Sequence, residues 1–127
     1  MKMLKPEYHC AIDMVIEIIG GKWKVLILWN LNEGVKRFNE LKRALPGITQ
    51  KMLTQQLREL EEHGLVNRIE YDQVPPRVEY VTTDLGKKLQ PTLFEMCKWG
   101  DMYSEDRGIT MNRCWTTYDF MEKKKDG

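Results

Sequence analysis

Residues 49–80 read TQKMLTQQLRELEEHGLVNRIEYDQVPPRVEY. The first part of this stretch has leucines at helical spacing, so it predicts an amphipathic helix over residues 49–63. Thr49 is a suitable N-cap for that helix, and Gly64 is a suitable stop. With about 100° between successive residues, one face points toward a core. The residues of that inward face are Leu53, Leu57 and Leu60.

The face of this helix opposite the leucines is polar, and its charge changes along its length. Arg and Gln pair with guanine and adenine in the major groove of DNA, whereas glutamates repel phosphates. The N-terminal two-thirds of this face carry Lys51, Thr54, Gln55 and Arg58, with Gln50 at the helix start. The C-terminal end carries Glu59, Glu61 and Glu62. This gradient favours a DNA-reading helix over the alternative of an ordinary solvated face.

Beyond this helix the residues alternate in period two, which predicts a β-hairpin with strands over residues 66–72 and 77–82. The Pro75-Pro76 pair stiffens the expected four-residue loop and protects it from edge pairing. Such a loop sets Glu70 directly opposite Glu79, a mildly repulsive pair. The predicted apolar face holds Ile69, Tyr71, Val78 and Tyr80, and the predicted polar face holds Arg68, Glu70, Arg77 and Glu79.

The rest of the chain predicts further helices. Apolar residues at helical spacing, with glycine and proline stops, place them over residues 10–19, 22–31, 38–45 and 83–105. Pro91 is expected to kink the last of these, and residues 111–121 are expected to form one more short helix. The tight turn before Thr49 makes a helix-turn-helix of residues 36–63, with the hairpin at 66–82 as its wing. The fold class is therefore α+β but mainly α, a winged helix-turn-helix with extra N-terminal and C-terminal helices in a single domain over residues 1–127.

Length and composition describe an ordinary globular chain. With 127 residues, 42% apolar and 31% charged, it is expected to build one core. No apolar run approaches the ~18 residues of a membrane span, and the N-terminus lacks an apolar export segment. Three cysteines, an odd number, fit a reducing cytosol better than a disulfide framework. We therefore expect a cytoplasmic protein with no membrane partner.

The net charge of +1 neither favours nor excludes a polyanionic partner. Binding to DNA depends instead on local clusters of Lys and Arg, which neutralise phosphates. Basic residues flank the 38–45 helix on both sides, and one arginine follows the prolines of the wing. Such residues can hold phosphates and fix orientation without reading sequence. The residues predicted to bind DNA are Lys36, Arg37, Lys42, Arg43, Thr49, Gln50, Lys51, Thr54, Gln55, Arg58 and Arg77.

Enzyme and metal chemistry have no framework in the sequence. The histidines are His9 and His63, and neither CxxC nor HExxH spacing occurs. Gly20-Gly21-Lys22 is too short for a GxxxxGK[ST] phosphate loop. The chain is predicted to be no enzyme and to need no metal or cofactor.

Cys10 stands at the start of the first predicted helix. The helix dipole favours a thiolate there, which suits a redox-sensing thiol. The alternative is a small buried apolar residue, a common role for cysteine. Both interpretations stay open. Cys97 follows the inward stripe of the last helix and is predicted to pack.

Several short motifs occur in a specific order along the chain. They are the Cys10 start, IGGKW (19–23), FNEL (38–41), LTQQLREL (53–60), GLV (64–66), PPRVEY (75–80), TDLG (83–86), LQP (89–91) and Trp99. In this combination the chain resembles the HxlR-type family of bacterial winged-helix transcriptional regulators, relatives of the MarR class. The resembling features run from Cys10 to about Tyr103.

The resemblance implies a homodimer whose first and last helices form the interface. Two recognition helices would then enter successive major grooves of a palindromic operator, about 34 Å apart. Some members of the family sense oxidants or electrophiles through the cysteine that matches Cys10, although Ala11 here replaces the proline that commonly follows. The operator sequence, any small effector and the choice between repression and activation stay open. The residues expected at the interface are Ile12, Ile16, Met96, Trp99, Tyr103 and Trp115.

A different class of function also stays open. The winged domain would be a protein-interaction module that never touches DNA, and the near-zero net charge is compatible with this. Binding that does not weaken with added salt would indicate it, because neutralising phosphates releases counterions.

Overall fold

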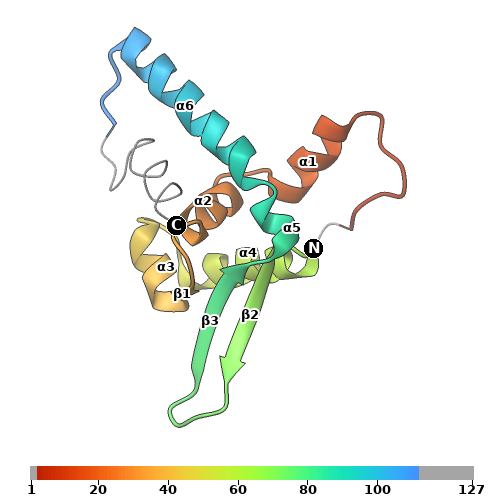
Figure 1. Ribbon diagram of the computed structural model, residues 1–127, viewed down its shortest axis with the longest axis vertical. Coiled ribbons are helices and arrows are strands. Elements are labelled where there is room, and N and C mark those ends of the chain that lie inside the picture. Colours follow the sequence, from red (N-terminus) through yellow and green to blue (C-terminus); the bar gives the residue numbers. More distant parts are fainter. Residues whose placement is uncertain (1–2, 112–127) are drawn as a thin grey trace. The chain divides into compact units, whose positions relative to one another are not determined.

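The computed structural model describes residues 3–111. Within them the order of elements is α1 (Ala11–Ile19), α2 (Trp23–Leu31), β1 (Lys36–Arg37), α3 (Phe38–Ala44), α4 (Gln50–Glu62), β2 (Val66–Tyr71), β3 (Arg77–Thr82), α5 (Asp84–Lys87) and α6 (Gln90–Arg107) (Figure 1). The predicted winged helix-turn-helix, α+β but mainly α, is confirmed. The chain divides into two compact units, Met1–Leu89 and Gln90–Gly127. No helix of the described part is long and apolar enough to cross a membrane.

The core of the first unit lies where α2, α3 and α4 pack together and meet the base of the hairpin. Leu53, Leu57 and Leu60 of α4 are almost fully buried, as their spacing predicted. Burying a leucine side chain stabilises the fold by about 1.5–3 kcal/mol, so these three residues anchor α4 strongly. Their burial fixes which face of α4 remains outside. The other side chains buried to the same degree are Ile27, Leu28, Leu41 and Val66.

Both ends of α4 are closed by the residues that the sequence indicated. The Thr49 hydroxyl accepts the backbone N–H of Met52 at 3.0 Å, a standard N-cap. At the other end, Gly64 has a positive φ of 77°, and the N–H of Leu65 donates to the carbonyl of Leu60 at 2.9 Å. This is a Schellman motif, in which a left-handed glycine satisfies the last carbonyls of the helix. The predicted start and stop of the helix are confirmed.

Three strands form an antiparallel sheet in the order β1-β3-β2. Tyr71 pairs with Arg77, so the loop spans the five residues 72–76 rather than the predicted four. Glu79 consequently pairs with Ile69, and the predicted pairing of Glu79 with Glu70 is wrong. A shift of one residue moves every side chain of one strand to the other face relative to its partner. The predicted assignment of residues to the two faces is therefore also wrong.

The observed register separates the two glutamates of the hairpin. Each now lies beside an arginine two positions away on its own strand: Arg68 with Glu70, and Arg77 with Glu79. The register thus removes the repulsive cross-strand pair and leaves the two attractive pairs on opposite faces of the hairpin. One face carries Arg77 and Glu79 together with Ile69 and Tyr71, and the other carries Val78 and Tyr80 together with Arg68 and Glu70.

The strand β1 was not expected from the sequence. It has two residues, Lys36 opposite Tyr80 and Arg37 opposite Glu79. Two residues are too few to show a period-two pattern. The pairing nevertheless matters, because it ties the chain just before α3 to the wing.

The single helix predicted over residues 83–105 is wrong: α5 ends at Lys87, and α6 begins at Gln90. Pro91 does not kink a continuous helix but lies in the first turn of α6. Proline has no N–H to bond the carbonyl four residues back, at Lys87, and its ring would collide with that carbonyl. In a first turn neither problem arises.

Thr83 caps the short helix α5. Its hydroxyl accepts the N–H of Gly86 at 3.0 Å and donates to the carbonyl of Gly64 at 2.6 Å. Its own N–H donates to the carbonyl of Leu65 at 3.0 Å. One residue therefore bonds both the end of α4 and the start of α5.

In the second unit, α6 carries an aromatic pair. The rings of Trp99 and Tyr103 stack with centroids 5.1 Å apart, and the Arg107 guanidinium lies 5.4 Å from the Tyr103 centroid. Gly108, with a φ of 67°, follows the last residue of the helix, Arg107. The short helix predicted over residues 111–121 and the predicted interface residue Trp115 lie outside the described residues.

Candidate nucleic-acid interface

The outer face of α4 gathers the residues that the sequence assigned to base reading. They line one shallow hollow of about 590 Å³ and are all exposed. This set, called the recognition face below, consists of Gln50, Lys51, Thr54, Gln55 and Arg58. Burial of the leucines on the opposite side leaves these side chains pointing away from the core. Their donors and acceptors are of the kinds that pair with base edges in the major groove.

Two threonines of α4 use their hydroxyls within the helix. The Thr49 oxygen already accepts the Met52 N–H as the N-cap. The Thr54 hydroxyl donates to the carbonyl of Gln50 at 2.8 Å. Thr49 therefore keeps its hydroxyl proton for an outside acceptor such as a phosphate, and Thr54 keeps its methyl group and its lone pairs.

The glutamates at the end of α4 differ in how much negative charge they place near the recognition face. Glu59 turns inward and binds Lys24 of α2. The hydrogen bond from the Lys24 ammonium is the main reason that the pKa of Glu59 lies below its ordinary value, with a smaller effect from the Gln55 amide. The carboxylate beside Arg58 in the sequence is thus neutralised within the protein, while Glu62 remains exposed one turn later.

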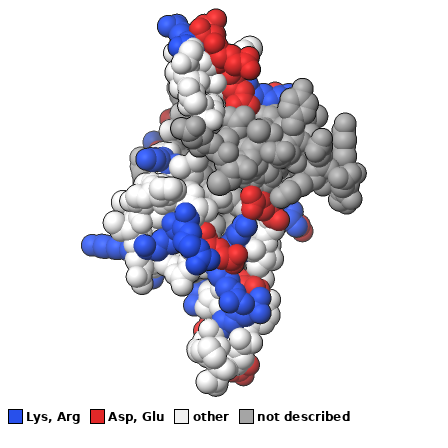
Figure 2. All heavy atoms as spheres, turned by 90° about the vertical axis from the view of Figure 1, so that its left-hand side faces the viewer, with Lys and Arg blue, Asp and Glu red and all other residues white. Residues whose placement is uncertain are grey.

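A second concave surface lies between α3 and the wing, the hairpin of residues 66–82. This groove, called the wing groove below, has a volume of about 810 Å³. Figure 2 shows Lys and Arg side chains gathered over this side of α3 and the adjoining wing. Its lining residues are Val35, Arg37, Phe38, Asn39, Glu40, Arg43, Gln73, Pro75, Pro76, Arg77, Val78 and Glu79. The structure therefore brings together three of the predicted phosphate-binding residues, Arg37, Arg43 and Arg77.

The two predicted lysines near α3 do not line the wing groove. Lys36 forms an ion pair with Glu33 at 2.8 Å, so part of its charge is neutralised. Lys42 lies in the last turn of α3 and is exposed. Within the described residues Lys42, Lys51 and Arg58 form no ion pair, which leaves their charge available to DNA.

Sequence reasoning missed two residues of the wing groove region, Glu79 and Tyr71. Glu79 is only 9% exposed and receives hydrogen bonds from Arg77. A hydrogen bond from the Tyr71 hydroxyl, followed by those from Arg77, lowers the pKa of Glu79. The same bond raises the pKa of Tyr71. A correct hairpin register would have found this cluster, because it places all three side chains on one face.

Cys10 is the N-cap residue of α1 and is exposed, which confirms its predicted place at the helix start. The alternative of a buried apolar residue does not describe this chain. The segment before it is held against α1, since Tyr8 donates a hydrogen bond to Glu17 and Lys5 lies 3.5 Å from the same carboxylate. Cys97 is half-buried.

The described residues that the resemblance assigns to a dimer interface are exposed in the single chain. Ile12 and Ile16 lie on one face of α1 and are 65% and 60% exposed. On α6, Met96, Trp99 and Tyr103 are exposed as well. Monomeric proteins rarely expose several large apolar side chains together, so these residues are suited to an interface.

Comparison with known proteins gives a consistent result. The family model described as HxlR-like helix-turn-helix matches residues 18–107. YkvN of Bacillus subtilis (strain 168), described as an uncharacterized HTH-type transcriptional regulator, is 56% identical over 99 residues, which cover 78% of this chain and 84% of YkvN. YtcD of the same organism, described in the same way, is 54% identical over 98 residues, covering 77% of this chain and 78% of YtcD. The solved structure of the redox regulator HypR in its reduced form matches with a TM-score of 0.72 and 46% identity, covering 76% of this chain and 95% of that one.

Proposed function

This chain belongs to the HxlR-like helix-turn-helix family and is a DNA-binding transcriptional regulator, and from that premise we propose how it binds. It acts as a homodimer that inserts α4 of each protomer into the major groove of a palindromic operator. Lys51, Thr54, Gln55 and Arg58 read base edges. Thr49, Gln50 and the basic residues of α3 and the wing hold the backbone.

One observation supports the reading residues above all. The side chains suited to base pairing lie together on the exposed face of α4, while the opposite face is locked into the core. A recognition helix needs this arrangement, because base readout requires side chains held at defined positions on a rigid element. The inward turn of Glu59 removes a repulsive charge from the same helix.

The phosphate contacts are supported by a different surface. Arg37, Arg43 and Arg77 meet along the wing groove, and Lys42 is exposed beside it. Lys36 takes part to a smaller extent, because Glu33 already binds it. Such contacts fix the register of the protein on the duplex but carry no sequence information.

Selection of bound sequences from random duplex DNA tests the whole proposal. The expected product is a palindrome whose half-sites are about 10 base pairs apart, centre to centre. Affinity for the selected duplex should fall steeply with added salt, as phosphate neutralisation requires. If no sequence is enriched and binding is insensitive to salt, the chain is a protein-interaction module and the proposal is wrong.

The dimer is tested separately at α1. Ile16→Asp places a charge on the exposed apolar face, and we expect it to convert a dimer into a monomer in sedimentation velocity. Glu7→Asp, a change in the exposed segment before α1, is the control and should leave the dimer intact. A parent chain that sediments as a monomer at micromolar concentration would overturn the dimer.

The exposed thiol of Cys10 supports a second role, as a redox sensor. Hydrogen peroxide would convert its thiolate to sulfenic acid, with hydroxide as the leaving group, and the change at α1 would alter operator affinity. The similarity to HypR, described as a redox regulator, favours testing this. Gel shifts with and without peroxide on the parent and on Cys10→Ser decide it, because an unchanged response in Cys10→Ser excludes this residue.

A further inference from the structure

We propose that Glu79 is a positioning residue of the DNA interface: its carboxylate fixes the guanidinium of Arg77 in the wing groove, so that one backbone phosphate binds there. This inference rests on the proposed function. It assigns a role to an acidic residue on a surface that binds a polyanion. Charge alone would predict the opposite role, a residue that weakens binding.

In this pair the enclosed Glu79 carboxylate accepts hydrogen bonds from the more exposed Arg77 guanidinium. The Arg77 Nη2 and Nε both donate to Oε2 of Glu79, at 2.6 and 3.1 Å. The Glu79 side chain is 11% exposed, whereas that of Arg77 is 41% exposed. The carboxylate is thus enclosed and the guanidinium faces outward. Among the described residues no hydrogen bond engages Nη1, and a guanidinium presents five N–H donors in a fixed plane.

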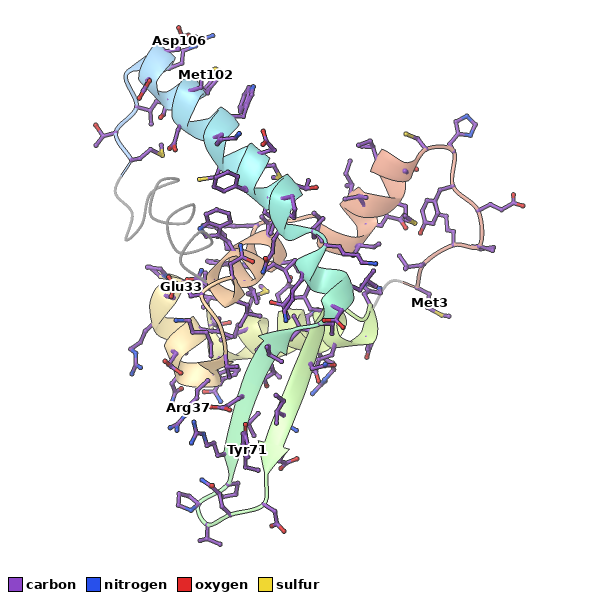
Figure 3. The ribbon with its side chains drawn as sticks, in the orientation of Figure 1. Met3, Glu33, Arg37, Tyr71, Met102 and Asp106 are labelled. Atoms are coloured by element: carbon purple, nitrogen blue, oxygen red, sulfur yellow. The ribbon has the colours of Figure 1, made fainter. Side chains whose placement is uncertain are left out.

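Two neighbours of the carboxylate favour its charged form. The Tyr71 hydroxyl hydrogen-bonds to Glu79, and the Tyr71 ring lies 5.5 Å from the Arg77 guanidinium. Arg37 lies opposite Glu79 in the backbone pairing of β1 with β3, and its charge also lowers the pKa of Glu79. Figure 3 shows Arg37 beside β3 below α3, with Tyr71 farther along the wing toward its tip. The cluster therefore joins the entry to α3 with the wing, which are the two walls of the wing groove.

The charge of the groove fits one phosphate. Its lining holds three arginines and two glutamates, Glu40 and Glu79, which leaves one net positive charge. Glu40 is occupied at the start of α3, where it accepts the N–H of Arg37 at 2.9 Å. A phosphodiester carries one negative charge. An arginine that is already ordered loses less side-chain entropy when it binds, so Glu79 increases affinity even though it carries the wrong sign.

The other ion pair of the wing provides a matched control. Arg68 and Glu70 lie 3.2 Å apart with side chains 40% and 61% exposed, and neither lines the wing groove. Glu70→Gln removes the same charge from the same hairpin on its opposite face. If only charge matters, Glu70→Gln and Glu79→Gln should both strengthen DNA binding slightly.

The experiment measures affinity for the selected operator duplex by fluorescence anisotropy over a range of salt. We expect Glu79→Gln to bind roughly threefold to tenfold more weakly than the parent, the range that ordering one arginine side chain implies. Glu70→Gln should bind as tightly as the parent or more tightly. Tyr71→Phe, which keeps the ring and removes the hydroxyl, should weaken binding in the same direction as Glu79→Gln by a smaller factor.

A double-mutant cycle separates positioning from a general effect on the fold. In an Arg77→Ala background, Glu79→Gln should no longer weaken binding, since the residue it positions is gone. Arg77→Ala alone should reduce the slope of log K against log salt by about 0.9, the value of one lost phosphate contact. Duplexes with one neutral methylphosphonate each should reveal a single position whose loss weakens the parent but not Arg77→Ala.

The outcomes distinguish this inference from the proposed function. If the parent binds DNA and Glu79→Gln binds equally or more tightly, Glu79 does not position Arg77, and the DNA-binding proposal stands. The positioning role is equally overturned if Glu79→Gln weakens binding by the same factor with and without Arg77. If Glu79→Gln fails to fold, Tyr71→Phe replaces it in the double-mutant cycle with Arg77→Ala. The positioning role is then overturned if Tyr71→Phe has the same effect on binding with and without Arg77. A parent that shows no salt-dependent DNA binding overturns both.

Discussion

Lys24 of α2 and Glu59 of α4 form an ion pair with 2.6 Å between Nζ and Oε2, and their side chains are only 10% and 14% exposed. The pair connects the helix at the centre of the core to the helix proposed to enter DNA. Glu59 directly follows Arg58 in the sequence. The pair links α4 to α2 beside the buried leucines and neutralises a negative charge next to the proposed reading residues.

Removing one partner of this pair should be far more costly than removing both. Lys24→Met leaves the Glu59 carboxylate largely buried without its cation, and we expect the free energy of unfolding to fall by about 3 kcal/mol. Lys24→Met combined with Glu59→Met should recover most of that loss, because no charge is left buried. Urea denaturation of the three proteins measures the cycle. Additive single effects would show that the two side chains are not coupled.

Acid should destabilise the protein partly through Glu59. The Lys24 ammonium holds the pKa of Glu59 below its ordinary value of 4.5 in the folded state, so the folded state binds this proton less readily than the unfolded chain. The stabilising contribution is therefore complete above about pH 4.5 and is lost as the pH falls through the lower, folded pKa. The difference in free energy of unfolding between the parent and Glu59→Gln, measured by urea denaturation, should shrink on acidification. A difference that stays constant between pH 6 and pH 3, roughly the window in which such a carboxyl titrates, would contradict the assignment.

Arg58 should contribute to sequence reading rather than to general affinity. If it pairs bidentately with guanine, Arg58→Ala weakens binding to the selected operator by about 1–3 kcal/mol and relaxes the preference at one position. Binding to unrelated duplex DNA should change much less. Glu62→Ala, on the same exposed side one turn later, serves as the control and should not weaken operator binding. An Arg58→Ala protein with parental operator affinity would remove Arg58 from the reading residues.

Gly86 should tolerate no side chain. A Cβ atom there would overlap the backbone carbonyl of Leu65, so α5 lies directly against the start of β2. We expect Gly86→Ala to lower the free energy of unfolding by about 1–3 kcal/mol, the usual cost of overpacking. Lys87→Ala, at an exposed position on the same helix, should have little effect. Equal denaturation midpoints for the two variants would show that α5 is loosely packed.

The bounds and the outward face of α4 could be predicted from the sequence because several independent signals agree there. The leucine spacing, the Thr49 cap and the Gly64 stop each locate the helix, and burial of the leucines then dictates which side faces outward. That is why the recognition face could be predicted residue by residue. The proposed reading residues follow from local rules alone.

The wing was harder to predict because its register depends on the length of the loop. One additional residue in the loop exchanges the faces, and alternation within each strand cannot reveal this. The role of Glu79 was missed for the same reason, since Tyr71 shares a face with Glu79 and Arg77 only in the true register. β1 was missed because two residues carry no pattern. The break before Pro91 was misjudged because the apolar spacing continues through it.

The hydroxyl of Thr83 has a consequence for how this fold can change. It donates to the carbonyl at the turn that closes α4 and accepts the amide that opens α5. The turn that ends α4 and the first turn of α5 are therefore linked through one oxygen atom, although the whole hairpin separates them in the sequence. Loss of this hydroxyl should loosen both helix ends together, so a change at the far end of the wing domain can reach the helix proposed to enter DNA.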